Sequence, residues 1–204
     1  MSARRVLIQF AHPVVERSRV GRPLLEAVRG LPGITVNDLY EEYPTMWIDV
    51  RREQALLVEH DVIVFQHPFY WYSTPAILKQ WQDMVLEHGW AYGDGTMLRG
   101  KITFNALTTG GPASAYRAEG YNRFTVRQLL APWEQTANLC GMRWLAPFVA
   151  HGALRPEAEL GIPELQRCYR RIVEALRDDH FDLARAAAAD QLDPDAALAL
   201  VEAT

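Results

Sequence analysis

The sequence predicts one α/β domain built on a parallel β-sheet. Three observations support this: 49% of the 204 residues are hydrophobic, five short apolar segments have the composition of strands, and a helix-length segment separates each from the next. Parallel strands need such crossovers, and helices on both faces of a parallel sheet bury its strands. The length fits one domain with a tail better than two domains.

The first half of the chain contains three of the expected strands. These are residues 6–11, 34–39 and 62–65. Apolar residues recur at helical spacing over residues 20–31, where Pro32 and nearby glycines end the first helix. Residues 40–49 are expected to form a loop, and Asp49 to cap a helix that runs to His60.

The second half continues the alternation. Thr74 is expected to cap a helix with Pro75 at its first position, and strands are expected over residues 101–107 and 144–150. Between these strands lies a broken helical stretch whose second segment begins at Pro132 and ends at Gly141. The last helix of the body, residues 1–180, has apolar residues at helical spacing over 165–176. Residues 181–204 are Ala-rich and acidic, and are expected to form a partly helical tail that packs on the body or on a partner subunit, or frays.

Composition excludes several classes of function. The formal net charge is −4 and no basic cluster exceeds a pair, which argues against nucleic-acid binding. Cys140 and Cys168 do not form a CxxC pair, so we expect a reducing compartment. The first residues pass directly into a strand-like run that is too short for a signal sequence, and no apolar run reaches the roughly 20 residues of a membrane span. We therefore expect a cytoplasmic protein.

Three loops at the carboxyl ends of expected strands have the composition of a binding site. They are residues 12–21, 66–75 and 108–116. In open α/β sheets, ligands bind beyond the carboxyl ends of strands, where the strand order reverses. If the first strand lies between the second and third, the three loops meet in one crevice.

The loop at 66–75 is the most distinctive of the three. It contains the consecutive aromatic residues Phe69, Tyr70, Trp71 and Tyr72 between a core strand and a helix. Two interpretations remain open: the rings form a platform for a flat ligand, or they cap the core or bury a dimer contact. His67, beside Pro68, is interpreted as a satisfied strand-end histidine rather than a ligand.

The other two loops contain groups suited to an anion. Ser18 is expected to cap the first helix, whose free N–H groups would accept an anion near His12 and Arg19, although such a serine is usually only a cap. Thr109 and the two glycines after it could form a nest of backbone donors or a plain tight turn. No dinucleotide or NTPase phosphate motif is present, so one phosphate group is the expected anion.

Metal and nucleophile chemistry are not indicated. The six histidines and two cysteines show no metal-binding spacing, and no G-x-S-x-G motif is present.

Residues 66–93, together with AHP after the first strand and TTGG after the fourth, resemble the flavodoxin-like NAD(P)H:quinone oxidoreductases. The most similar branch is the ancillary subunits of glutathione-gated potassium efflux systems. The resemblance covers about residues 4–178. It implies a flavodoxin-like, doubly wound, five-stranded parallel sheet of order 2-1-3-4-5, and a homodimer that binds FMN, or FAD as in mammalian relatives.

The resemblance also implies roles for individual residues. The flavin phosphate would be held by His12, Ser18, Arg19, Val20 and Gly21. The isoalloxazine would lie along Phe69, Tyr70, Trp71 and Tyr72, and its pyrimidine edge would face Thr109, Gly110, Gly111 and Pro112. Tyr116 matches a family tyrosine that hydrogen-bonds the flavin or the substrate.

Three departures from the family pattern affect these roles. Gly21 stands where close relatives often have Asn, and Pro112 removes one possible N–H donor. Asn122 stands where mammalian relatives have a histidine, which puts a Tyr–His proton relay in doubt and leaves Tyr116 or water as the proton source.

The implied activity is ping-pong hydride transfer from NAD(P)H through flavin N5 to a quinone. Two alternatives stay open: a regulatory flavin-binding subunit of a membrane potassium antiporter, located on the inner membrane face, and an electron-carrier flavodoxin. The last ranks lowest, because carriers tend to be strongly acidic.

Overall fold

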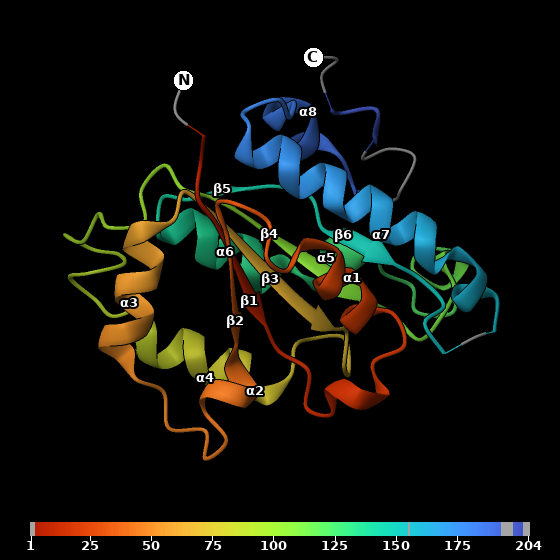
Figure 1. Cartoon of the computed structure of the whole chain (residues 1–204), viewed down its shortest axis with the longest axis horizontal. Helices are drawn as coiled ribbons and strands as arrows, with labels where there is room; N and C mark the ends of the chain where they lie inside the picture. Colours follow the sequence, from red (N-terminus) through yellow and green to blue (C-terminus); the bar gives the residue numbers. More distant parts are fainter. Residues whose placement is uncertain (1–2, 155, 193–197, 202–204) are drawn as a thin grey trace.

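The computed structural model describes residues 3–154, 156–192 and 198–201, and contains a parallel sheet with helices on both faces (Figure 1). The strands are β1 (Val6–Phe10), β2 (Ile34–Asp38), β3 (Val62–Pro68), β4 (Ile102–Thr108), β5 (Arg143–Trp144) and β6 (Phe148–Ala150). Their order is β2-β1-β3-β4-β5, and β6 also pairs with β4. The expected order is therefore confirmed, and β1 lies between β2 and β3 as the crevice requires.

Two hydrophobic clusters fill the space between the sheet and its helices. Along β1, Val6, Ile8 and Phe10 face one cluster and Leu7 faces the other, which is the alternation of a strand buried on both sides. The first cluster is covered by α1 (Gly21–Val28), α7 (Pro156–Arg177) and α8 (Leu183–Ala188). The second is covered by α2 (Leu39–Glu42), α3 (Val50–Glu59), α4 (Ala76–Val85), α5 (Val126–Leu129) and α6 (Ala131–Leu139).

Helix starts agree with the sequence in part. Asp49 caps α3 as expected, because its side chain accepts from the N–H of Arg52 at 3.1 Å. The expected cap at Thr74 is wrong: Pro75 occupies the N-cap position in an extended conformation, and α4 begins one residue later. The expected loop at 40–49 is also interrupted, because the Asp38 side chain caps the short helix α2.

The expected strand 144–150 is divided into β5 and β6. Leu145 N–H still donates to Thr103 O in β4, but the next N–H, that of Ala146, turns to Ala186 O in α8. Pro147 has no N–H to continue the ladder, so pairing resumes only at Phe148.

Part of the segment beyond residue 180 packs on the body. Phe181, Ala186, Leu192 and Leu200 are buried in the cluster that α1 and α7 cover, and Figure 1 shows α8 beside α7. Pro194 lies outside the described residues. Among the described helices, none is both long and apolar enough to cross a bilayer.

A buried carboxylate joins the sheet to the second helical layer. Glu53 in α3 is fully buried, and its oxygens accept from Gln9 Nε2 and Trp81 Nε1, both at 2.8 Å, and from the Tyr43 hydroxyl at 2.7 Å. Arg52 supplies the opposite charge at 2.6 Å. Every close partner is a donor, so the ionised form of Glu53 is the one that this network satisfies.

Candidate functional site

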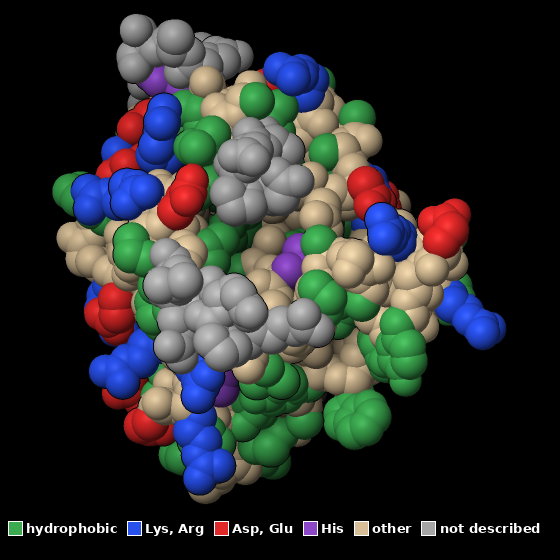
Figure 2. All heavy atoms as spheres, turned by 90° about the vertical axis from the view of Figure 1, so that its right-hand side faces the viewer, with side chains coloured by type: hydrophobic (Ala, Val, Ile, Leu, Met, Phe, Trp, Pro, Cys, Tyr) green, Lys and Arg blue, Asp and Glu red, His purple; other side chains and the backbone are tan. Residues whose placement is uncertain are grey.

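The three expected loops meet at the carboxyl ends of the strands around a cleft of about 480 Å³, which we call the strand-end cleft. Its lining includes His12, residues 17–21, residues 68–71, Gly110 and Leu154. Figure 2 shows the face of the molecule that lies to the right in Figure 1, on which a hollow with a histidine side chain in it lies beside hydrophobic side chains. The volume is in the range of small-molecule sites.

The first loop forms one end of the cleft. The expected N-cap role of Ser18 is wrong, because two more residues precede α1 and Val20 occupies the N-cap position. The Ser18 hydroxyl nevertheless accepts from the N–H of Arg22 at 3.1 Å, so it stays beside the first helical turn. A Cβ on Gly21 would lie 2.8 Å from Ser18 Oγ, and glycine therefore keeps this hydroxyl in place. Arg19 also lines this end.

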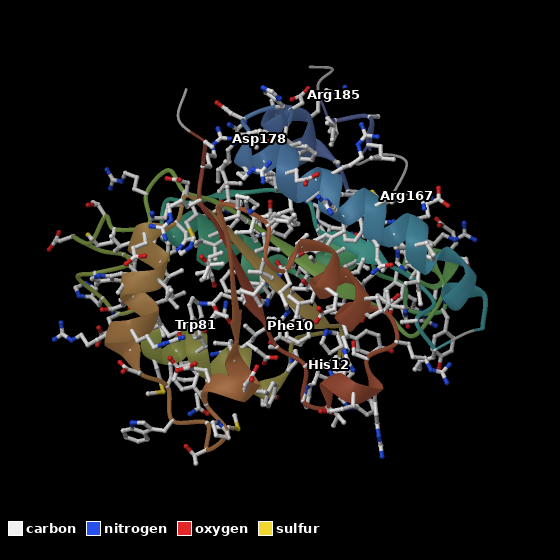
Figure 3. The ribbon with its side chains drawn as sticks, in the orientation of Figure 1. Phe10, His12, Trp81, Arg167, Asp178 and Arg185 are labelled. Atoms are coloured by element: carbon white, nitrogen blue, oxygen red, sulfur yellow. The ribbon has the colours of Figure 1, made fainter. Side chains whose placement is uncertain are left out.

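His12 lies two residues beyond Phe10, the last residue of β1 (Figure 3). Its Nδ1 accepts from the N–H of Val14 at 3.2 Å, so the neutral ring has its proton on Nε2 and can donate. Burial lowers the pKa of His12, although the nearby Val14 and Glu16 act in the opposite direction. At neutral pH, His12 is therefore a neutral donor.

The aromatic residues form a tight turn with an unusual backbone. Trp71 and Tyr72 have φ values of 50° and 62°, and Ser73 N–H donates to Tyr70 O at 2.9 Å across the turn. Bulky residues rarely adopt this left-handed region, and each costs about 1–3 kcal/mol. Phe69 is buried, whereas Trp71 is 93% exposed. The turn thus combines both interpretations: Phe69 caps the core and the next three rings are displayed.

Beneath this turn, β3 ends in two buried polar residues. His67 bonds Pro68 O through Nδ1 at 3.0 Å and Asn105 through Nε2 at 3.1 Å, and burial lowers its pKa to about 4. It is a satisfied strand-end histidine, as expected. Gln66 donates to Gly21 O at 2.7 Å and accepts from the Tyr169 hydroxyl at 3.0 Å, so it ties the start of α1 to β3.

The third loop separates the strand-end cleft from a second cleft of about 500 Å³. Tyr72, Gly111, Pro112, Tyr116 and Asn122 are among the residues that line this second cleft. The Tyr72 hydroxyl donates to Asn122 Oδ1 at 3.2 Å. Burial raises the pKa of Tyr116, and its hydrogen bonds with Thr109 and Asn122 oppose that rise. Tyr116 therefore keeps its proton at neutral pH.

Gly110 and Thr109 fix the shape of this loop. A Cβ on Gly110 would lie 2.9 Å from Leu154 Cδ1, so only glycine fits without displacing Leu154. Thr109 is buried, and its hydroxyl donates to Gly111 O at 2.9 Å. The backbone N–H of Thr109 is used by Ala150 O. The N–H of Thr109 is therefore not available to a ligand, and the loop is a polar turn held by its own hydrogen bonds.

The sequence interpretation missed His151. Its Nδ1 lies 3.0 Å from Thr109 Oγ1, and its ring centroid lies 5.6 Å from that of Tyr116. The signal was present, because His151 directly follows the last expected strand and so had to lie at the same edge of the sheet. Within the described ranges, no group of His, Cys, Asp or Glu is arranged to hold a metal ion.

The sequence matches known proteins over most of its length. A family model described as a flavodoxin-like fold matches residues 4–173. The glutathione-regulated potassium-efflux system ancillary protein KefG of Shigella flexneri is 48% identical over 156 residues, which are 76% of this chain and 85% of that protein.

Three solved structures are similar in both fold and sequence. One, described as a thermophilic tryptophan halogenase from Streptomycin violaceusniger, is 44% identical with a TM-score of 0.77, over 81% of this chain and 96% of that one. General stress protein 14 from Treponema denticola, in complex with FMN, is 39% identical with a TM-score of 0.80, over 84% of this chain and 99% of that one. A protein of P. pentosaceus described as an NADPH-quinone reductase is 32% identical with a TM-score of 0.73, over 82% of this chain and 96% of that one. With the sheet order and the matched length, these findings show that the chain belongs to the flavodoxin-like family.

Proposed function

We propose that this chain is a flavin-dependent NAD(P)H:quinone oxidoreductase that binds FMN in the strand-end cleft. The observation that carries the proposal is the geometry of the cleft, which has polar donors at one end and displayed aromatic rings at the other. The FMN complex of the Treponema denticola protein and the quinone reductase of P. pentosaceus support it, since both exceed 30% identity to this chain.

The cleft fits the two chemical parts of FMN. Its phosphate would lie at the start of α1, held by His12, Ser18, Arg19, Val20 and Gly21, where main-chain N–H groups and a neutral histidine donate. The first-turn N–H of Arg22 is already used by Ser18, so the serine hydroxyl proton is free for the ligand. Arg17 also lines this end, so two arginines would add positive charge beside the phosphate.

The flat ring of the flavin would lie along residues 69–72, with Thr109, Gly110, Gly111 and Pro112 facing its pyrimidine edge. The exposed indole of Trp71 is suited to stacking, and Gly110 lets the main chain approach closely. When bound, the flavin would supply the two-electron redox chemistry. The chain would supply orientation and donors that favour negative charge on the ring.

The second cleft would receive NAD(P)H and the quinone in turn, which is the geometric basis of ping-pong turnover. Tyr72 and Tyr116 form walls against which planar substrates can stack. The Tyr116 hydroxyl is protonated at neutral pH and can donate a proton to a reduced quinone oxygen. Asn122 holds both tyrosine hydroxyls but cannot exchange protons as an imidazole does.

The same proposal extends to assembly and location. Trp71 and Tyr121 are 93% and 90% exposed beside the clefts, and a homodimer would cover such apolar surface. The low charge and the lack of a spanning helix among the described residues are compatible with a cytoplasmic protein.

A second function is favoured by one specific comparison. The 48% identity to an ancillary protein of a potassium-efflux system favours a regulatory role on a membrane antiporter at the inner membrane face, with reductase activity incidental. Co-purification with such an antiporter, unchanged when turnover is abolished, would support this role over the enzymatic one.

The test begins with the absorbance spectrum of the purified protein, after titration with FMN. We expect bound flavin, NAD(P)H oxidation that depends on menadione, and parallel-line ping-pong kinetics. Tyr116→Phe should lower kcat by about 100-fold, the low end of the range for general acid catalysis, with little change in FMN affinity. Tyr92→Phe, outside both clefts, is the matched control. A colourless protein that refuses FMN would end the proposal.

A further inference from the structure

The segment after α8 lies outside the matched family region, which ends at residue 173. It nevertheless contacts residues that adjoin the third loop, residues 108–116. Leu192 N–H donates to Pro147 O at 2.8 Å, and Val149 N–H donates to Leu192 O at 3.1 Å, so Leu192 is fixed beside β6. The adjacent residue, Gln191, is thereby placed next to His151 at the end of β6, with Oε1 of Gln191 lying 3.2 Å from Nε2 of His151.

Three side chains then connect this segment to the third loop. Gln191 contacts His151, Nδ1 of His151 lies 3.0 Å from Thr109 Oγ1, and Thr109 donates to Gly111 O at 2.9 Å. The residues after His151 support the same loop, because Gly152 N–H donates to Gly111 O at 2.9 Å. The carbonyl of Gly111 therefore lies at the end of a continuous polar chain.

Gln191 can serve Nε2 of His151 in either protonation state of the ring. Thr109 Oγ1 donates to Gly111 O, and in that arrangement the same oxygen accepts from His151, whose Nδ1 carries a proton, while Tyr116 is a further partner of the hydroxyl. On a neutral ring Nε2 is then an acceptor, whereas on a charged ring it is a donor. The Gln191 oxygen, which faces Nε2 in this structure, can accept from a charged ring. If the amide is rotated by 180°, its NH₂ group can donate to Nε2 of a neutral ring. A leucine can do neither.

We propose that Gln191 is a positioning residue that acts through His151 to fix Thr109 and the carbonyl of Gly111. This inference rests on the proposed function for its consequence, since the loop it fixes is the one assigned to the pyrimidine edge of the flavin. Its structural content concerns the chain alone, and so it can be tested without any flavin.

The first experiment uses the full-length, flavin-free protein. Gln191→Leu keeps a branched side chain of similar bulk and removes both polar groups, Gln191→Glu keeps the side-chain length and an acceptor oxygen, and Asp190→Ala is the matched control. Asp190 accepts from the Thr125 hydroxyl at 3.2 Å and so docks the same segment without touching His151. Unfolding midpoints verify that each variant is folded.

We expect the ring nitrogen NMR shifts of His151 to change in Gln191→Leu, with faster amide exchange at Gly152, whose N–H donates to Gly111 O. In Asp190→Ala both should match wild type, and Gln191→Glu should retain a fixed ring by favouring its charged form. Equal effects of Gln191→Leu and Asp190→Ala would overturn the proposal, because the segment would then act only by docking. Unchanged ring shifts in Gln191→Leu would overturn it as well.

The second experiment titrates the same proteins with FMN. Gln191→Leu should change the FMN dissociation constant by about 2- to 10-fold, the range of one hydrogen bond, and shift the flavin reduction potential. In a His151→Ala background the same substitution should have no further effect. An additive effect would overturn the pathway through His151. If wild type binds no FMN, the proposed function fails, while the NMR comparison still decides this inference.

Discussion

Trp71→Gly is expected to separate stability from ligand binding. Trp71 adopts a φ of 50°, where a residue with a Cβ is strained and glycine is not, and its side chain is 93% exposed. The left-handed backbone at Trp71 lowers the stability of the folded state, and the exposed side chain buries too little surface to offset that cost. We therefore expect the substitution to leave the folded state intact and to remove a ligand contact.

The magnitude follows from three contributions. Relief of the left-handed conformation stabilises the folded state by about 1–2 kcal/mol, and the greater freedom of glycine in the unfolded chain costs about 0.5–1 kcal/mol. The exposed ring contributes almost no burial. The free energy of unfolding should thus be unchanged or rise by up to about 1.5 kcal/mol, while loss of stacking weakens FMN binding by about 2- to 10-fold.

Chemical denaturation and FMN titration on the same preparation measure both quantities. Trp47→Gly is the control, because Trp47 is also exposed, at 78%, but is not among the residues with positive φ. It should lose about 0.5–1 kcal/mol of stability and bind FMN normally. If Trp71→Gly were destabilised as much as this control, the assignment of strain at residue 71 would be refuted.

Three further predictions concern acid stability, the phosphate end and the buried carboxylate. The pKa of His67 is about 4 in the folded protein and 6.5 ordinarily, so below about pH 6.5 the unfolded chain binds more protons than the folded one. The free energy of unfolding of wild type should therefore fall by roughly 3 kcal/mol by about pH 4. In His67→Gln this loss between pH 6.5 and pH 4 should be smaller, as measured by denaturation at a series of pH values. Gly21→Ala adds a Cβ that would displace Ser18 Oγ, so it should weaken FMN binding about tenfold or more but leave the binding of riboflavin, which has no phosphate, unchanged. The control Gly161→Ala adds its Cβ in open space and should alter the binding of neither ligand. Glu53→Gln places an amide NH₂ group against side chains that themselves donate, and should lower the free energy of unfolding by about 2–4 kcal/mol. A variant as stable as wild type would contradict the assignment of an ionised Glu53.

The sheet was predictable because its signals are local and repeated. Runs such as residues 62–65 have the composition of doubly buried strands, and their helical spacers force a parallel sheet with all carboxyl ends at one edge. That rule alone brought His12, the aromatic turn and Thr109 together. It also applied to His151, which was overlooked because no motif marks it.

The remaining differences depend on geometry that residue type does not determine. Ser18 and Thr74 both have the composition of helix caps, but the backbone at Val20 and Pro75 sets where each helix begins. The left-handed conformation of Trp71 and Tyr72 contradicts their intrinsic preference and is imposed by the surrounding fold. The contact between Gln191 and His151 joins segments 40 residues apart, beyond the reach of any local pattern.

The division of the last strand at Pro147 also determines how this border of the sheet is finished. Beyond β4 the ladder consists of two short pieces, and the N–H groups of Ala146 and Val149 point outward to Ala186 O and Leu192 O. An uncovered border of this kind invites pairing with another molecule. The C-terminal segment satisfies these donors itself, and so it shields this border of the sheet from strand addition by a second molecule.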